Sequence, residues 1–329
     1  MRPQNLGVVA CAMIAVGSYG AGATRYRGDV LRAAGLEHLS YGHGRGLMDL
    51  LLTAGIVGLV AAWVAIWKTR PSAGEMRRTV IWWAGTLAFS APILSRDVYS
   101  YLMQGAMLRD GFDPYSEGAA VNPGPYLWEV SHDWRNTTTP YGPLHLGLGK
   151  AVTWLVGENV TAGLVVYRMI ALAGFALIAW AVPRIAAQIG GSPALAWWLG
   201  VANPVMLMHL IGGMHNEAVM VGLVSAGLLS CLRRRWCTPG IVLIALAVSL
   251  KATAAVALPF VVWLMVKRHS STLAGQVGTL AACGAWALTI NVGVIQVVTW
   301  VSGTTWGWLA EITGNSKVIN PLAGPTLAA

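Results

Sequence analysis

The stretch SRDVYSYLMQGAMLRDGFDPYSEGAAVNPGPYLWEVSHDWRNTTTPYGPLH, residues 95–145, is an acidic and aromatic insert between long apolar segments. Six of the 13 acidic residues of the chain lie in it: Asp97, Asp110, Asp113, Glu117, Glu129 and Asp133. The apolar segments on either side carry few ionisable groups. A membrane protein that gathers its carboxylates into one segment is expected to carry out chemistry at the membrane surface.

The composition around this insert is that of a membrane protein. Of the 329 residues, 56% are hydrophobic and 11% are charged, and the mean hydropathy is +0.59. Repeated apolar runs predict an all-α polytopic membrane protein, with residues 1–329 forming a single transmembrane domain in the lipid bilayer. At the N-terminus an uncleaved first helix is favoured over a secretory signal. The net charge of +9 does not indicate a nucleic-acid partner, because the basic residues lie in short clusters at segment ends.

These basic clusters predict the topology, because positively charged segments are retained in the cytoplasm. The clusters are Lys68, Arg70, Arg77 and Arg78; residues 233–235; and residues 267–269. If residues 79–94 cross outward, residues 95–141 form an extracytoplasmic loop. The later clusters stay inside if residues 142–156 form an interfacial helix and residues 239–266 form a hairpin of two half-length helices.

Asp97 is the first candidate for chemistry. We expect it at the exit of the segment 79–94, where a carboxylate faces the negative end of the helix dipole and needs a partner. Arg96 could be that partner in an ordinary interfacial ion pair. Alternatively, the carboxylate of Asp97 could take a proton from a hydroxyl as a general base. The residues alone leave both interpretations open.

Three further polar features fall on the same predicted side of the membrane. The sequences Gly-Phe-Asp-Pro-Tyr at 111–115 and Pro-Tyr-Gly-Pro-Leu at 140–144 are turn formers that also carry aromatic rings able to stack on sugars. The triplet at 215–217, His-Asn-Glu, either caps a helix or forms hydrogen bonds to a polyol. Each of these features therefore has a structural and a functional interpretation.

Lys251 is the most costly of these groups in a bilayer. A lysine at the membrane midplane costs about 2.5–3.5 kcal/mol on insertion scales. At the tip of the predicted hairpin its ammonium group would reach the outer headgroup region. There it either holds a lipid phosphate or only extends toward the interface.

Taken in order, these motifs resemble a known family. The chain shows Ser-Arg-Asp-Val-Tyr-Ser-Tyr at 95–101, the two turn motifs, Gly-Gly-Met-His-Asn-Glu at 212–217 and Leu-Lys-Ala-Thr-Ala at 250–254. Together they resemble the actinobacterial polyprenol-phosphate-mannose-dependent α-(1→6)-mannosyltransferases of lipomannan assembly, of the GT-C class. The resemblance covers roughly residues 46–325. Such enzymes usually continue through several more spans, so C-terminal spans are expected to be missing from this chain.

The resemblance implies a GT-C-like transmembrane helical bundle in the cell (plasma) membrane, with its active site on the extracytoplasmic face. It implies polyprenyl-phosphate mannose as donor, a mannoside or lipomannan acceptor, and transfer with inversion. Asp97 becomes the catalytic base, and Arg96 and Lys251 the candidates for the donor phosphate. The candidate substrate-binding residues are Tyr99, Asp113, Tyr115, Tyr141, His215, Asn216 and Glu217. No cofactor is expected, although a divalent metal bound by Asp97 with other acids of the loop stays open.

Two other functions remain as alternatives. A lipid or sugar transporter or flippase would account for the spans and for the intramembrane lysine. It also predicts inverted repeats and charges scattered within the spans, and the sequence shows neither. The third hypothesis is an inactive truncated paralogue.

Overall fold

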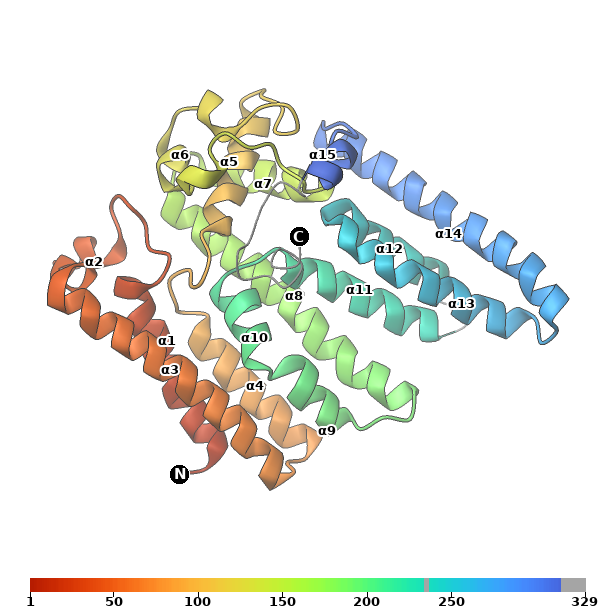
Figure 1. The fold of residues 1–329 in the computed structure, drawn as a ribbon, viewed down its shortest axis with the longest axis horizontal. Coiled ribbons are helices and arrows are strands. Elements are labelled where there is room, and N and C mark those ends of the chain that lie inside the picture. Colours follow the sequence, from red (N-terminus) through yellow and green to blue (C-terminus); the bar gives the residue numbers. More distant parts are fainter. Residues whose placement is uncertain (234–236, 315–329) are drawn as a thin grey trace, which may run out of the picture.

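The computed structural model describes residues 1–233 and 237–314, and within these ranges the chain is helical without strands. Four helices are long and apolar enough to cross a membrane: α1 (Pro3–Ala21), α3 (Gly42–Thr69), α8 (Val160–Gln188) and α14 (Leu273–Ser302). A fifth candidate is the pair Pro193–Val201 and Pro204–Gly212, which is bent by 50°. These findings confirm the all-α polytopic membrane protein (Figure 1).

The N-terminal helices form one side of the bundle. α1 packs along α3 and also contacts α4 (Ala73–Leu87), as Figure 1 shows. The short helices α2 (Val30–Ala33) and η1 (Glu37–Ser40) lie between α1 and α3 in the chain. Ser72 and Glu75 form a capping box that starts α4, because each side chain accepts a backbone N–H of the other.

The expected position of Asp97 relative to a helix dipole is wrong. α4 ends at Leu87, and an irregular segment follows before Asp97 begins α5 (Asp97–Arg109). The carboxylate therefore lies at the N-terminus of a new helix, where the dipole favours a negative charge. The segment 95–141 accordingly begins with a helix, and its remainder carries η2 (Ala119–Val121), α6 (Pro125–Glu129) and η3 (His132–Trp134).

α5 crosses α7 (Pro143–Val156) at two glycines. A Cβ atom on Gly105 would lie 2.2 Å from the backbone of Gly149, so neither position has room for a side chain. This close crossing brings Gln104 of α5 next to His145 of α7. Figure 1 shows α5, α6 and α7 gathered at the same end of the bundle as α15 (Trp308–Gly314).

The central helix α8 packs against α11 (Glu217–Leu232), which packs in turn against α12 (Cys237–Leu250). Between α8 and α11 run α9 (Pro193–Ala196), η4 (Trp197–Val201), α10 (Pro204–Met206) and η5 (Leu207–Gly212). η4 and η5 are π-helical, a form found frequently at functional sites.

The chain reverses direction at Lys251. After α12, η7 (Ala252–Val256) leads into α13 (Ala257–His269). Arg268 at the end of α13 donates to the carbonyls of Cys231 and Leu232 at the end of α11, at 2.7 and 2.8 Å. α12 and α13 thus run side by side with Lys251 at their turn. Of the predicted cytoplasmic clusters, Arg234 and Arg235 lie outside the described residues.

Candidate active site

Four side chains from three separate segments form one linked chain of charges. His215 Nδ1 lies 3.3 Å from Asp97 Oδ2 and 3.8 Å from Glu217 Oε2. The ammonium of Lys251 donates to Glu217 Oε1. We call Asp97, His215, Glu217 and Lys251 the site cluster. Asp97 is partly open, with 33% of its side chain exposed.

Each member of the site cluster lies where a helix begins or breaks. Asp97 starts α5, and its backbone N–H donates to Ser95 Oγ at 3.0 Å. Glu217 starts α11, so its carboxylate is favoured by that helix dipole as well. Lys251 follows the last residue of α12. Helix ends leave backbone groups free for side chains and ligands, which is why the polar residues gather there.

The motif at 140–144 supplies one wall beside Lys251. The backbone N–H of Gly142 donates to the carbonyl of Leu250 at 3.0 Å. A Cβ on Gly142 would lie 2.3 Å from the carbonyl oxygen of Ser249, so the motif can dock on α12 only with glycine there. The ring of Tyr141 then lies 5.5 Å from Lys251 Nζ, in cation–π contact.

The buried residue His145 contacts Asn216, which follows His215 of the site cluster in the chain. Asn216 Nδ2 lies 3.1 Å from His145 Nδ1, and His145 Nε2 lies 3.3 Å from Gln104 Oε1. If the amide of Asn216 donates, Nδ1 accepts and Nε2–H donates to Gln104, which is the neutral tautomer. Burial lowers the pKa of His145 to about 3, in agreement with a neutral ring. Asn216 thus connects His145 to the site cluster, because it contacts His145 and directly follows His215 in the chain.

Sequence reasoning missed His145 and Gln104 as parts of the site. His145 directly follows the motif at 140–144, in the helix expected at the interface, and a single histidine there gives no sign of a role at the site. Gln104 carried no signal, because a single glutamine in this helix has no distinctive spacing. The crossing of α5 and α7 is what brings the two side chains into contact.

Arg96 belongs to a second cluster and pairs with Glu129 rather than with Asp97. Its guanidinium lies 3.2 Å from Glu129 Oε2 and donates to the carbonyls of Glu129 and Thr24. It also packs on the rings of Tyr26 and Tyr99, at 3.7 and 4.6 Å from their centroids. Tyr99 is buried, and its hydroxyl donates to the carbonyl of Ala23 at 2.8 Å. Both residues therefore tie the start of α5 to the loop after α1.

Asp113 and Tyr115 stabilise the loop that contains them. Asp113 Oδ1 accepts the backbone N–H of Tyr115 at 3.0 Å, and its Oδ2 accepts the hydroxyl of Ser116 at 3.1 Å. The Tyr115 side chain is buried and packs against Gly307, close to the start of α15. Substrate contact by either residue stays a prediction.

Each of the residues 215–217 has one buried polar atom without a hydrogen-bond partner among the described residues. The three atoms are His215 Nε2, Asn216 Oδ1 and Glu217 Oε2. Buried polar atoms are nearly always paired, so three in consecutive residues indicate a place for a ligand or water. No group of three or more His, Cys, Asp or Glu side chains in the described part of the chain is arranged to hold a metal ion.

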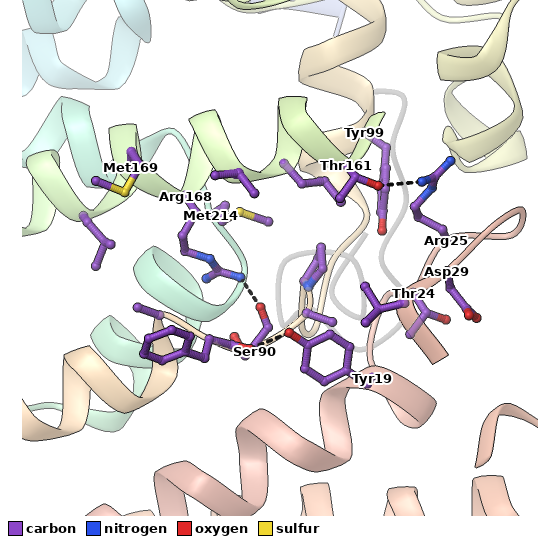
Figure 2. A pocket seen from close by; sticks show the side chains of 18 residues that line it. Tyr19, Thr24, Arg25, Asp29, Ser90, Tyr99, Thr161, Arg168, Met169 and Met214 are labelled. Atoms are coloured by element: carbon purple, nitrogen blue, oxygen red, sulfur yellow. Dashed lines mark hydrogen bonds between the residues drawn. The ribbon is translucent and has the colours of Figure 1, made fainter. Parts of the chain in front are cut away.

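A large cavity lies on the α8 side of the same region. Its volume is about 500 Å³, and its walls come mainly from α8, from the segment between α4 and α5 and from residues 19–30 (Figure 2). Apolar side chains such as Phe89, Leu164 and Met169 line it. Met214, which directly precedes His215, also lines the cavity. An apolar ligand in this cavity would thus reach the polypeptide next to the site cluster.

Comparison with known proteins gives a consistent result. A family model described as "Alpha-(1->6)-mannopyranosyltransferase, N-terminal domain" matches residues 4–267. The chain is 53% identical to the alpha-(1->6)-mannopyranosyltransferase A of Corynebacterium glutamicum, over 96% of this chain and 69% of the relative. It is 42% identical to the protein of the same name from Mycobacterium tuberculosis, over 99% of this chain and 64% of the relative. No solved structure matches it.

The chain spans about two thirds of the length of the curated relatives it matches. The family model nevertheless covers most of the chain, including Asp97, His215, Glu217 and Lys251. The match to the first of these relatives extends over nearly all of it. The chain therefore belongs to the alpha-(1->6)-mannopyranosyltransferase family of glycosyltransferases.

Proposed function

We propose that this protein transfers mannose from polyprenyl-phosphate mannose to an α-(1→6)-mannan or lipomannan acceptor, with inversion at the anomeric carbon. The observation that carries the proposal is the site cluster, which joins a partly exposed carboxylate to a cation through His215 and Glu217. The names of the relatives support the mannosyl transfer and the α-(1→6) linkage.

Asp97 is the catalytic base in this proposal. Its carboxylate takes the proton of the primary hydroxyl of the acceptor while that oxygen attacks C1 of the β-linked mannosyl phosphate. One displacement then inverts the anomeric carbon and yields an α linkage. The contact of 3.3 Å with His215 Nδ1 holds the carboxylate in place, so its second oxygen can face the hydroxyl.

Lys251 stabilises the leaving group. The bond between C1 and the phosphate oxygen breaks, and polyprenyl phosphate departs with the electron pair and an additional negative charge. An ammonium beside that oxygen lowers the energy of the transition state. Lys251 has three N–H donors, so it can hold the phosphate while it stays bonded to Glu217. Arg96 has no part in this step, because its donors are engaged by Glu129 and Thr24.

The apolar cavity is the proposed place for the isoprenoid chain of the donor. Its lining side chains are mainly aliphatic or aromatic, and its volume lies within the usual range of ligand sites. Its wall at Met214 adjoins His215 (Figure 2). The lipid chain would thus lie in the bundle, with the sugar phosphate directed toward Asp97 and Lys251.

No metal is required by this proposal, because a lipid phosphate departs readily and Lys251 supplies the positive charge. Transfer measured with EDTA should therefore equal transfer without it. A loss of transfer that added Mg²⁺ or Mn²⁺ restores would contradict this part of the proposal.

The site cluster is proposed to face the extracytoplasmic side of the cell membrane. Ser116 is exposed in the segment 95–141. A cysteine introduced there should react with an impermeant reagent added from outside. A cysteine at Thr69, in the first basic cluster, should not. Cys237 is replaced by serine in both variants, because it is the one of the four cysteines that is not fully buried. The opposite labelling pattern would contradict the proposed orientation.

A direct assay tests the reaction. Membranes containing the protein are incubated with radiolabelled polyprenyl-phosphate mannose and a short α-(1→6)-mannoside, beside membranes containing Asp97→Asn. The expected product carries one further α-mannosyl unit, which an α-mannosidase removes. Product that resists α-mannosidase and yields to β-mannosidase would contradict inversion. If wild-type membranes form no such product, the proposed reaction is contradicted.

A further inference from the structure

We propose that Arg168, a buried arginine in the middle of α8, is a positioning residue that holds the two segments carrying Asp97 and His215 in register. This inference rests on the proposed function, in which these two residues must act together. Arg168 lies outside the site cluster. It acts through the segments 88–96 and 207–216, which lead directly into Asp97 and His215.

The contacts of Arg168 join these two segments. Its NH2 group donates to the carbonyl of Ser90 at 2.7 Å (Figure 2). Its NH1 group donates to the carbonyls of Ile211 and Gly212. The planar guanidinium is thus a rigid bridge from α8 to both segments. The same junction contains a direct backbone bond, from the N–H of Ile93 to the carbonyl of Gly212 at 3.2 Å.

Burying the charge of Arg168 at this position carries a free-energy cost. α8 is a candidate membrane span, the side chain is buried, and none of the described carboxylates forms an ion pair with it. Ionisable groups within spans usually have a defined task. The compensation here comes from carbonyl groups that follow α4 and end η5. Because helix C-termini are negative, one cation can stabilise both ends at once.

Both bridged segments have strained backbone just before their catalytic residue. Three non-glycine residues have positive φ in the described chain, and two of them are Leu94 (φ 64°) and Met214 (φ 54°). Leu94 precedes Asp97 by three residues, and Met214 directly precedes His215. Such conformations persist only where the surrounding contacts hold them. The carbonyls bound by Arg168 lie four residues before Leu94 and two or three residues before Met214.

In this proposal Asp97 and His215 act at the site, and Arg168 positions the segments that carry them. Asp97 and His215 come from different segments, and their contact of 3.3 Å depends on the relative position of the two. Arg168 fixes that position from α8, where its side chain also lines the large cavity (Figure 2). Without its bridge, both strained turns can relax independently, and the carboxylate loses its alignment with the hydroxyl of the acceptor. A misplacement of about 1 Å can lower a catalytic rate about 100-fold.

The test compares Arg168→Gln and Arg168→Lys with two control variants on the same helix. Arg184→Gln makes the same chemical change at an exposed position. Phe175→Ala removes buried packing from the same helix. Per folded molecule, Arg168→Gln should lower kcat by about 10- to 100-fold, with the KM values for donor and acceptor changed less than about threefold. Arg168→Lys should fall between it and wild type, and both controls should keep the wild-type kcat.

Gly212→Ala disturbs the same junction while it keeps Arg168. The new Cβ would lie 2.3 Å from Cδ1 of Ile93, so the Ile93 side chain or the two segments must shift. The same loss of kcat is expected, which keeps the test valid if Arg168→Gln fails to fold. A kcat within twofold of wild type for both variants would overturn the proposal. A raised donor KM at unchanged kcat would also overturn it, because Arg168 would then bind the phosphate directly.

Hydrogen exchange separates this inference from the proposed reaction. In Arg168→Gln the backbone amides of Ile93 and of residues 211–216 should exchange faster than in wild type, and in Arg184→Gln they should not. If wild-type membranes transfer no mannose but this exchange pattern appears, the proposed reaction is contradicted and the positioning role of Arg168 is supported. Unchanged protection of these amides in Arg168→Gln would overturn the bridge whatever the activity.

Discussion

Arg96 and Asp97 are neighbours in the chain, yet they belong to two charge clusters of opposite character. Arg96 joins Glu129, whose side chain is 2% exposed and accepts the backbone N–H groups of Tyr26 and Arg27 as well. Asp97 joins His215, Glu217 and Lys251, where exposure is partial and buried atoms lack partners. Arg25 Nε, beside Glu129, also lacks a hydrogen-bond partner, so the contrast lies in the central pair itself. The polar atoms of Arg96 and Glu129 are engaged within the protein, whereas His215 Nε2 and Glu217 Oε2 are not and are open to a ligand.

The two clusters also differ in what surrounds them. The cluster of Arg96 lies between the loop after α1 and the end of α6, and aromatic rings cover its guanidinium. The site cluster has the Tyr141 ring beside it. The large cavity reaches both clusters, because Thr24, Arg25 and Tyr99 line it near Arg96, and Met214 lines it next to His215. Variants of the two clusters should therefore separate effects on catalysis from effects on stability.

The largest effect is expected for Asp97→Asn. The amide keeps the size and much of the hydrogen bonding of the side chain but cannot accept the proton, and loss of a general base typically lowers the rate about 10²- to 10⁴-fold. Turnover of purified protein is measured beside its melting temperature, which should stay within about 2 °C of wild type. More than about a tenth of wild-type turnover would remove Asp97 as the base.

A smaller but more specific effect is expected for Lys251→Met. Methionine keeps an apolar stem and removes the charge, so the apparent KM for polyprenyl-phosphate mannose should rise about tenfold or more, while the KM for the mannoside stays nearly constant. Lys267→Met, at the far end of α13, is the matched control. Unchanged donor KM and kcat in Lys251→Met would leave this lysine with its ion pair to Glu217 alone and remove it from donor binding.

A variant of His145 tests whether a residue beside the site cluster contributes to the stability of the fold. Burial lowers its pKa to about 3, so the folded protein keeps it neutral, while the unfolded chain protonates it below about pH 6.5. Its contribution to stability is therefore complete above pH 6.5 and is lost as the pH falls toward 3, by about 2 kcal/mol at pH 5. The melting temperature should fall less steeply from pH 7 to pH 5 in His145→Gln than in wild type. Equal slopes would contradict the neutral assignment.

The smallest effect on transfer is expected for Glu129→Gln. Removal of the carboxylate leaves the guanidinium groups of Arg96 and Arg25 without a counter-charge and should lower the free energy of unfolding by about 3 kcal/mol. Transfer per folded molecule, measured below the melting temperature, should stay within about twofold of wild type. A hundredfold loss of turnover in folded Glu129→Gln would place this cluster in the active site and end the distinction between the two.

Much of this architecture is readable in the sequence. The apolar runs require helices, because backbone groups in a bilayer must be paired within the segment. The polar residues that interrupt these runs carry a free-energy penalty, which is why Asp97, His215, Glu217 and Lys251 could be singled out without coordinates. The same reasoning located the turn motif at 140–144, whose glycine and prolines restrict the backbone.

The partners of these residues depend on contacts between distant segments, which local patterns do not encode. Sequence adjacency paired Arg96 with Asp97, but the end of α4 at Leu87 and the new helix at Asp97 turn the two side chains toward different partners. His145 and Arg168 acquire their roles through the crossing of α5 with α7 and the approach of two segments to α8. The penalty for burying a polar group is a local property of the chain, whereas its compensation comes from whichever atoms the packed helices bring within hydrogen-bond distance.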